Sequence, residues 1–251
     1  MLLPEIARRF AAAADDPKFV APVDLLQFIC DSCSRSSGTN APKDVINLVM
    51  FTIFISLSDI TFHGTHFLYD IAGRPEMRAK LYEEQQQIVA KHGTAFTKEA
   101  LQDMTYMDAC LRETLRLHTG ATNAARMSLR EVTFANGMSI PAGRLCLVHT
   151  WAANRRSDYH GAADDYMPER TAGQPGVCAS TTGPSYTTFG MGRTPCPGRF
   201  FAISEIKSLA AWLLRRYEFA TESGRRPGNK TQKFGEYLPV PEPVVFAPRN
   251  L

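Results

Sequence analysis

Cys196 is the residue best placed to do chemistry, because its surroundings suit a thiolate. It lies in FGMGRTPCPGRFF, residues 189–201. Only a thiolate is a good metal ligand or nucleophile, and it needs nearby positive charge or hydrogen-bond donors. Pro197 can open a helix whose positive end lies near the sulfur, and Arg193 adds a cation. Three glycines leave room for a large flat ligand, which favours a metal-ligating cysteine over one packed in a glycine turn: Gly190, Gly192 and Gly198.

Two charged patterns precede this cysteine. RETLRL places Glu113 and Arg116 three residues apart, hence on one face of a helix. YMPER, residues 166–170, adds Arg170. Taken alone, Glu113 and Arg116 could equally form an ion pair on a helix surface. The three patterns become informative through their order and separation along the chain.

In that order the patterns resemble the cytochrome P-450 family, with its E-x-x-R, P-E-R and F-x-x-G-x-x-x-C-x-G segments. The fixed positions of the last are Phe189, Gly192, Cys196 and Gly198. The resemblance implies that Cys196 is the thiolate ligand of haem iron, with Phe189 packed over the sulfur. It also implies a buried triad of Glu113, Arg116 and Arg170, which would pin the irregular chain upstream of the cysteine. LYDIAGRPE and CPGRFFAISEIK look most like filamentous-fungal members.

Other site residues follow from the same resemblance. Arg126 lies where the family often binds a haem propionate, although it could also be a surface arginine on a strand. Thr194 occupies a position that is commonly Arg or His, and Arg193 would partly substitute for it. Three residues of the helix that resembles the family's I helix are candidates for proton delivery: Ser58, Asp59 and Thr61. The alternative is an aspartate facing solvent.

The expected fold is mainly α with a small β part: a cytochrome P-450-like helical fold truncated at the N-terminus. Residues 1–251 would form a single domain resembling the C-terminal half of the family, from the I helix to the haem loop and last helix. Hydrophobic periodicity and breakers predict helices, hairpin strands around Asn136-Gly137 and an irregular stretch over 151–188. The helices are expected at 2–14, 23–33, 43–72, 75–93, 98–104, 105–118 and 200–219.

These elements carry three further expectations. The apolar run 45–57 is shorter than a membrane span, which needs about 20 residues, so we expect a buried core helix. On the last helix, four residues fall on one apolar stripe: Ala202, Ile206, Leu209 and Leu213. The tail over 233–248 is expected to form a short strand pair.

Composition narrows the function classes. The 251 residues are 44% hydrophobic with a net charge of +3 and no basic block, so nothing indicates nucleic-acid binding. Six irregularly spaced cysteines and no signal peptide indicate a reducing compartment. Cys30 and Cys33 form a C-x-x-C pair, which we interpret as incidental thiols rather than a redox or zinc site. We expect a cytoplasmic or endoplasmic-reticulum-surface location, with no membrane anchor in this chain.

The resemblance implies a haem-thiolate monooxygenase that inserts one atom of dioxygen into a small organic substrate, in fungal secondary metabolism. Its electrons would come from an NADPH-dependent flavoprotein reductase. The alternative is a truncated, non-catalytic remnant or one half of a split haem protein that pairs with a separate N-terminal half. A third interpretation is haem-thiolate chemistry without a reductase, using peroxide or performing an isomerisation or dehydration.

Overall fold

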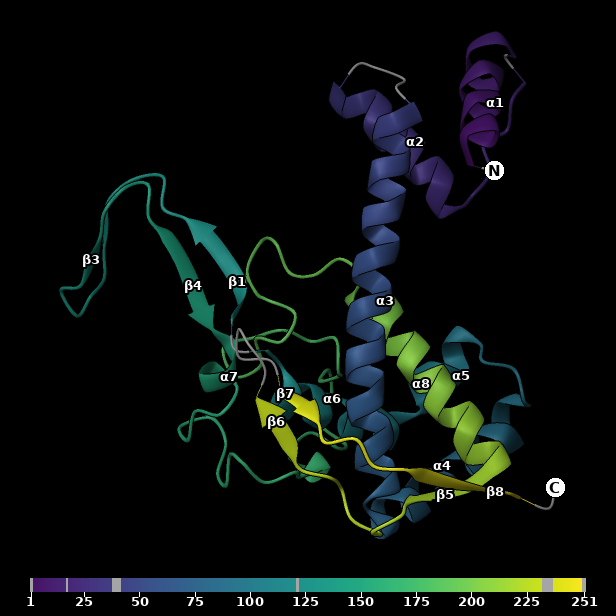
Figure 1. Cartoon of the computed structure of the whole chain (residues 1–251), viewed down its shortest axis with the longest axis vertical. Helices are drawn as coiled ribbons and strands as arrows, with labels where there is room; N and C mark the ends of the chain where they lie inside the picture. The colour runs from purple at the N-terminus through teal and green to yellow at the C-terminus, as the bar shows by residue number, and fades with distance from the viewer. Residues whose placement is uncertain (1, 17, 38–41, 121, 232–236, 250–251) are drawn as a thin grey trace. The chain divides into compact units, whose positions relative to one another are not determined.

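The computed structural model describes residues 2–16, 18–37, 42–120, 122–231 and 237–249. The contacts divide the chain into two compact units, Met1–Asp59 and Ile60–Leu251, and the single domain that the sequence indicates stays a prediction. The long helix α3, Pro42–Ala72, contributes residues to both units. Figure 1 shows the order of the elements along the chain.

The first unit contains α1 (Leu2–Asp15), α2 (Leu25–Ser37) and the beginning of α3. Its small core includes Cys30 and Cys33, together with Ile6, Ile29, Val45 and Val49. Burial raises the pKa of the Cys30 thiol, which disfavours the reactive thiolate. In the described part of the chain, no group of three His, Cys, Asp or Glu residues could hold a metal ion. These observations agree with thiols that pack in a core.

The prediction that the apolar run 45–57 is buried in the core is wrong. Val45 and Val49 pack in the first unit's core, but Phe51 is 59% exposed and Phe54 is 70% exposed. An apolar composition indicates that a helix needs a partner surface, but composition alone does not determine whether a partner surface covers it. By length and composition alone, α3 is the one helix in the described residues that is apolar enough to cross a membrane.

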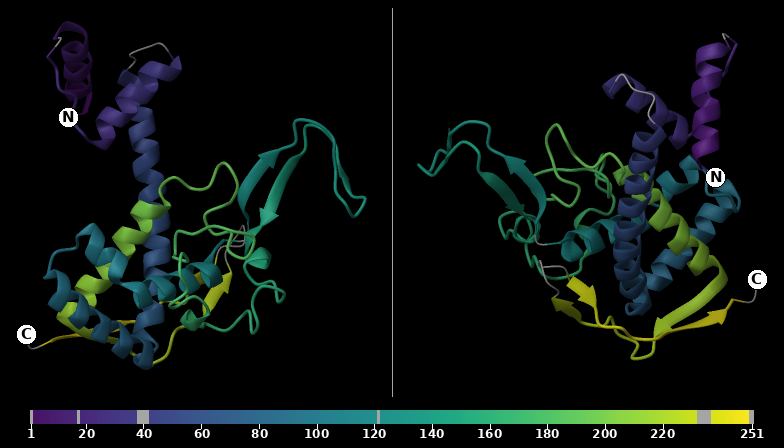
Figure 2. Two further views of the ribbon diagram at one scale, coloured as in Figure 1. Left: turned by 180° about the vertical axis from the view of Figure 1, so that it is seen from behind. Right: turned by 45° about the horizontal axis from the view of Figure 1, so that its top comes forward.

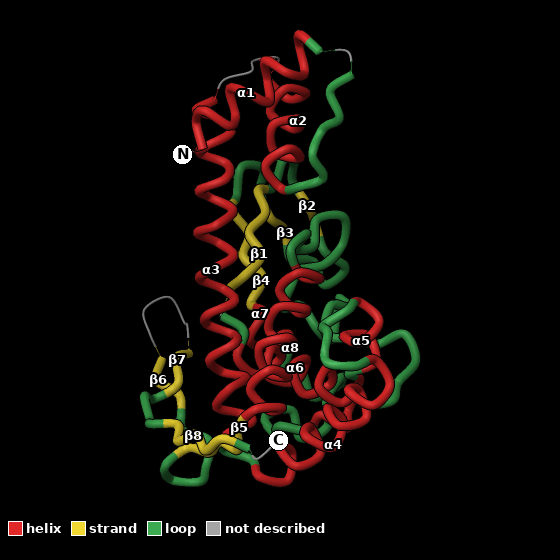
Figure 3. The backbone as a smooth tube through the Cα atoms, turned by 90° about the vertical axis from the view of Figure 1, so that its right-hand side faces the viewer, coloured by secondary structure: helices red, strands yellow, loops and turns green. Residues whose placement is uncertain are grey.

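The second unit has its core where α4, α6 and α8 pack against one another and against the end of α3. Its helices are α4 (Pro75–His92), α5 (Lys98–Asp103), α6 (Thr105–His118), the short α7 (Thr150–Ala153) and α8 (Arg199–Arg216). From Ala109 to His118 every residue of α6 is buried, so this helix lies at the centre of the unit (Figure 3).

Within the described ranges the strands form four antiparallel pairs. In chain order they are β1 (Thr122–Met127) with β4 (Leu145–His149), β2 (Val132–Thr133) with β3 (Ser139–Ile140), β5 (Tyr217–Thr221) with β8 (Val244–Pro248), and β6 (Asn229–Thr231) with β7 (Tyr237–Pro239). Figure 2 shows β1 and β4 extending away from the helices of the second unit. The helical class and the hairpin around Asn136-Gly137 are as predicted.

Three predictions near the C-terminus are wrong. The tail strands do not pair with each other, because β7 pairs with β6 and β8 pairs with β5. The last helix ends at Arg216 instead of residue 219, because Tyr217–Thr221 joins β8 as a strand. The buried face of α8 is also rotated from the predicted stripe: Leu209 is 55% exposed, whereas Ile203 and Leu214 are buried. Lys207 lies on the buried face because its ammonium donates to Leu101 O at 2.6 Å and to Asp108 at 3.1 Å.

Candidate functional site

The structure brings Glu113, Arg116 and Arg170 together. Arg116 Nη2 and Nε donate to the two Glu113 carboxylate oxygens at 2.7 and 2.8 Å, and both side chains are at most 5% exposed. Arg170 Nε, from the 3-10 helix η1 (Pro168–Arg170), donates to Glu113 Oε1 at 3.1 Å. The backbone N–H of Met167 adds a fourth bond at 3.0 Å. One carboxylate is thus surrounded by donors, which is the arrangement a buried charge requires.

The two arginines extend this cluster into the irregular stretch. Arg116 donates to the carbonyls of Asn154 at 3.0 Å, Ala163 at 2.6 Å and Asp165 at 3.2 Å. Arg170 donates to the carbonyls of residues 161 and 162. These residues belong to no strand whose ladder could supply hydrogen-bond donors to their carbonyls. The two guanidiniums donate those hydrogen bonds instead.

Asn154 carries the same network towards the cysteine loop, and sequence reasoning missed it. It is fully buried, and its Oδ1 accepts from Thr187 N at 2.7 Å and from Thr187 Oγ1 at 2.9 Å. Its Nδ2 donates to Thr188 Oγ1 at 3.0 Å. Thr188, directly before Phe189, is therefore linked through Asn154 to Arg116 near the end of α6. A single Asn in an irregular stretch has no spacing signal that could have identified it.

The cysteine loop is a closed turn. Cys196 N donates to Phe189 O at 2.8 Å, and Arg199 donates to Cys196 O at 2.7 Å. Gly190 and Gly192 have φ values of +71° and +79°, a region that glycine occupies without strain. Helix α8 begins at Arg199, with Gly198 as its N-cap, so Pro197 lies just outside the helix. The loop holds the exposed Cys196 at the entrance of α8.

Two residues, Phe189 and Arg126, were predicted to act together with the cysteine loop. The Phe189 ring contacts the Tyr186 ring at a centroid distance of 6.4 Å and packs on the second unit's core. Its packing over the sulfur stays a prediction. Arg126, on β1, donates to Thr194 Oγ1 in the loop at 2.6 Å, so these two positions meet. Arg193 is exposed in the same loop.

The proton-delivery candidates all lie on α3, where they were expected. Ser58, Asp59 and Thr61 are exposed, and Ser58 Oγ donates to the backbone carbonyl of Phe54 at 2.9 Å. The Thr61 carbonyl accepts from Thr65 Oγ1 at 2.7 Å. Ser58 and Asp59 belong to the first unit and Thr61 to the second. Their role in proton delivery stays a prediction.

The residues around Cys196 fit a haem group. A Cβ built on Gly192 would meet no atom within 4 Å, and one on Gly198 would meet only the Cys196 sulfur, at 3.9 Å. The Cys196 side chain is exposed, so its sulfur is accessible to a ligand. Arg126 and Arg193 are cations that suit the carboxylates such a ligand carries.

Comparison with known proteins now decides the family. The model of the family described as cytochrome P-450 matches residues 7–246. The chain belongs to the cytochrome P-450 family. Its match to the family covers both compact units, including the E-x-x-R helix α6 and the cysteine loop.

Several curated relatives of this chain come from fungi. The cytochrome P-450 monooxygenase prhD of Penicillium brasilianum is 32% identical over 97% of this chain and 47% of its own length. The monooxygenase braC of Annulohypoxylon truncatum is 30% identical over 91% and 48%, and terK of Tolypocladium album is 26% identical over 100% and 50%. The chain thus spans about half the length of the curated relatives it matches.

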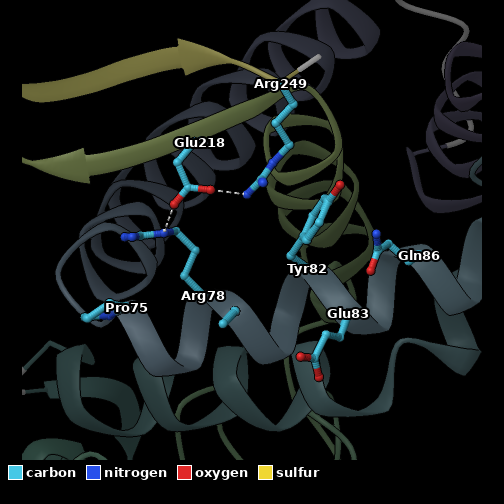
Figure 4. A pocket seen from close by; sticks show the side chains of 8 residues that line it. Pro75, Arg78, Tyr82, Glu83, Gln86, Glu218 and Arg249 are labelled. Atoms are coloured by element: carbon cyan, nitrogen blue, oxygen red, sulfur yellow. Dashed lines mark hydrogen bonds and ion pairs between the residues drawn. The ribbon is translucent and has the colours of Figure 1, made fainter. Parts of the chain in front are cut away.

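A surface pocket of the second unit lies apart from these residues. It has a volume of about 340 Å³ and lies between α4 and the pair β5–β8 (Figure 4). Glu218 accepts from Arg78 at 2.9 Å and from Arg249, whose guanidinium lies 3.8 Å from the centre of the Tyr82 ring. The charges that face this pocket are largely paired with each other, and none of the predicted site residues lines it.

Proposed function

We propose that this chain binds haem through the Cys196 thiolate and takes part in monooxygenation of a small organic substrate. The observation that supports the proposal most is the held cysteine loop. Cys196 is exposed at a turn closed on Phe189, and Asn154 and the Glu113 cluster connect the preceding chain to α6. Such pre-organisation keeps a ligand in place when the group binds.

Haem with a thiolate ligand supplies the activation of dioxygen and cleavage of its O–O bond. The chain's own residues hold that group and its surroundings. Cys196 supplies the thiolate, Gly192 and Gly198 leave the sulfur open, and Arg126 and Arg193 neutralise the carboxylates. Ser58, Asp59 and Thr61 are the candidates for moving protons along α3. Electrons come from an NADPH-dependent flavoprotein reductase.

The kind of substrate is proposed from the relatives. Several are fungal monooxygenases, and we infer a secondary metabolite as substrate. A second candidate function is supported by two observations. The chain spans about half its relatives' length, and apolar side chains of α3 such as Phe54 and Leu57 are exposed. On this candidate the chain is a non-catalytic remnant or acts with a separate N-terminal half.

The test is the carbon-monoxide difference spectrum of the reduced full chain after haem supplementation. We expect a strongly red-shifted Soret band in the wild type and in the matched control Cys178→Ser, because Cys178 is the other exposed cysteine. Cys196→Ser should lose the band. A red-shifted band that persists in Cys196→Ser would refute Cys196 as the ligand. The absence of any band in the wild type would favour the remnant or split-protein function.

A further inference from the structure

A buried polar cluster in the second unit has no part in the proposed function. Its centre is Asp70, at the end of α3, which is fully buried. Asp70 accepts from Arg226 Nε at 2.9 Å, from Arg74 Nη1 at 2.5 Å and from Thr114 Oγ1 at 2.7 Å. Burial alone would raise the pKa of Asp70, but His118, Arg74 and Arg226 together hold it below its usual range. The carboxylate is therefore charged and anchors Arg226.

Two histidines lie against the same arginine. His66, on α3, and His118, on α6, are stacked with ring centroids 4.3 Å apart. Arg226 Nη2 lies 2.9 Å from His66 Nδ1 and 3.2 Å from His118 Nε2. The other nitrogen of His66, Nε2, lies 2.6 Å from the carbonyl of Tyr237. Since a carbonyl only accepts, Nε2 of His66 carries the proton and Nδ1 accepts from Arg226.

These contacts fasten one segment of the chain, which we call the clasp: Arg226, β6 and β7. Asn229, in β6, lies 3.2 Å from His118 Nδ1, and Tyr237, in β7, is bound by His66. The backbone of the clasp also approaches α3 closely. A Cβ built on Gly73 would lie 2.1 Å from the backbone nitrogen of Arg226, so only glycine fits there. The clasp is thus held on α3 and α6 by both of its strands.

The environment of His66 favours its neutral form. A second proton on His66 would place an N–H at Nδ1 directly against an N–H of Arg226. Burial and then His118 lower the pKa of His66 to about 3. Burial also lowers the pKa of His118, although Asp70 opposes this.

Other charged or titratable groups lie near these rings. Arg74 faces Asp70 from the chain between α3 and α4, and Arg155 acts on His118 from beyond α7. His63, one turn before His66 on α3, has its pKa lowered by burial to about 4, and its Nδ1 is buried without a hydrogen-bond partner. No hydrogen bond joins His63 to Arg226 in the described residues. His63 therefore titrates in a similar range without touching the clasp.

We propose that His66 is an acid-sensitive latch: while neutral it holds Arg226 and Tyr237 together, and its protonation at Nδ1 sets it against Arg226 and loosens the clasp on α3. The inference uses only the geometry of the second unit and does not rest on the proposed haem chemistry. Because the folded pKa is depressed, the contribution of His66 to stability is present above the usual 6.5 and declines as pH falls towards 3.

A built-in reporter makes the latch measurable. The Trp151 ring is stacked on Tyr237, at 6.1 Å between centroids, and the chain has two tryptophans, the other being Trp212. In a Trp212→Phe, His149→Gln background, which also removes the imidazole that lies 6.2 Å from the Trp151 ring, Trp151 emission reports on the clasp. We expect that emission to change between pH 6.5 and about 3, at a higher pH than the loss of helix seen by circular dichroism.

The variants separate His66 from other acid effects. His66→Gln keeps an amide that can donate to Tyr237 and accept from Arg226 but does not titrate, so the emission change should disappear or move down by more than about one pH unit. His63→Gln is the matched control and should keep the wild-type transition. Gly73→Ala should displace Arg226 without any titration and give the released emission at neutral pH.

Two results would overturn the latch. One is the same transition in His66→Gln as in the wild type; the other is a transition that His63→Gln abolishes. If His66→Gln fails to fold, hydrogen exchange of the wild type decides. After correction for the intrinsic pH dependence, the amides of Tyr237 and Leu238 should lose protection in acid before those of α4. Simultaneous loss in both segments, or no loss before global unfolding, contradicts the proposal.

Discussion

Glu113→Gln tests whether the triad holds the second unit together. The change removes one buried charge and keeps the size of the side chain. Because Arg116 donates to both carboxylate oxygens, either orientation of the new amide places an N–H group against an arginine N–H. Arg116 is 2% exposed and keeps its charge, while Arg170 and Met167 also lose an ionised acceptor.

The expected loss follows from this burial. Removing one partner of a buried ion pair costs about 3–5 kcal/mol in the free energy of unfolding. For a chain of this size, each kcal/mol lowers the melting temperature by roughly 2–4 °C, so a drop on the order of 6–20 °C is expected. The matched control is Glu169→Gln in the same P-E-R segment. Glu169 pairs with Lys80 at 3.6 Å with both side chains more than half exposed, so the control should cost less than about 1 kcal/mol.

Urea unfolding followed by helical circular dichroism measures both variants. We expect a clear fall in the midpoint for Glu113→Gln and almost none for Glu169→Gln, with similar slopes if both unfold in one step. Equal midpoints for the two variants would refute the argument that the Glu113 cluster carries stability through burial. A lower slope for Glu113→Gln would instead show that the irregular stretch had already opened in the native state.

Two further changes test smaller parts of the same unit. Asn154→Ala leaves the Thr187 N–H and hydroxyl without their buried acceptor, so we expect a loss of about 1–3 kcal/mol in urea unfolding; an unchanged midpoint would show that the loop before Phe189 is held by other contacts. Thr97→Ala removes the N-cap that accepts from Ala100 N at 3.2 Å, so the local stability of α5 should fall by about 1 kcal/mol. Relative to the wild type, amide exchange should become faster in α5 and stay unchanged in α4; unchanged exchange in α5 would count against this prediction.

Much of the triad could be predicted from the sequence, and the reason is physical. Glu113 and Arg116 lie three apart on a helix, which alone places them on one face, and family-like spacing identified Arg170 as the third member. The backbone carbonyls that complete the site could not be predicted, because residues 161–165 carry no pattern that distinguishes a folded loop from an open one. Asn154 is missed for the same reason.

The latch residues were out of reach for a different reason. His66, Asp70, His118 and Arg226 come from α3, α6 and the clasp, and they share no spacing. The structure places His66 in the core, where it is fully buried. The prediction for the apolar run on α3 was wrong, because its composition predicted burial whereas Phe54 is exposed.

The long-range hydrogen bonds of Arg116 and Glu113 also bear on the order of events during folding. Arg116 bonds to carbonyls 38, 47 and 49 residues further along the chain, and Glu113 accepts from groups 54 and 57 residues away. Such distant contacts form late, because the intervening loop loses entropy before they compensate for it. Helix α6 is synthesised before the loop that it organises, so Arg116 precedes each of the carbonyls that it binds. The turn that presents Cys196 is then one of the last parts of the chain to take its shape.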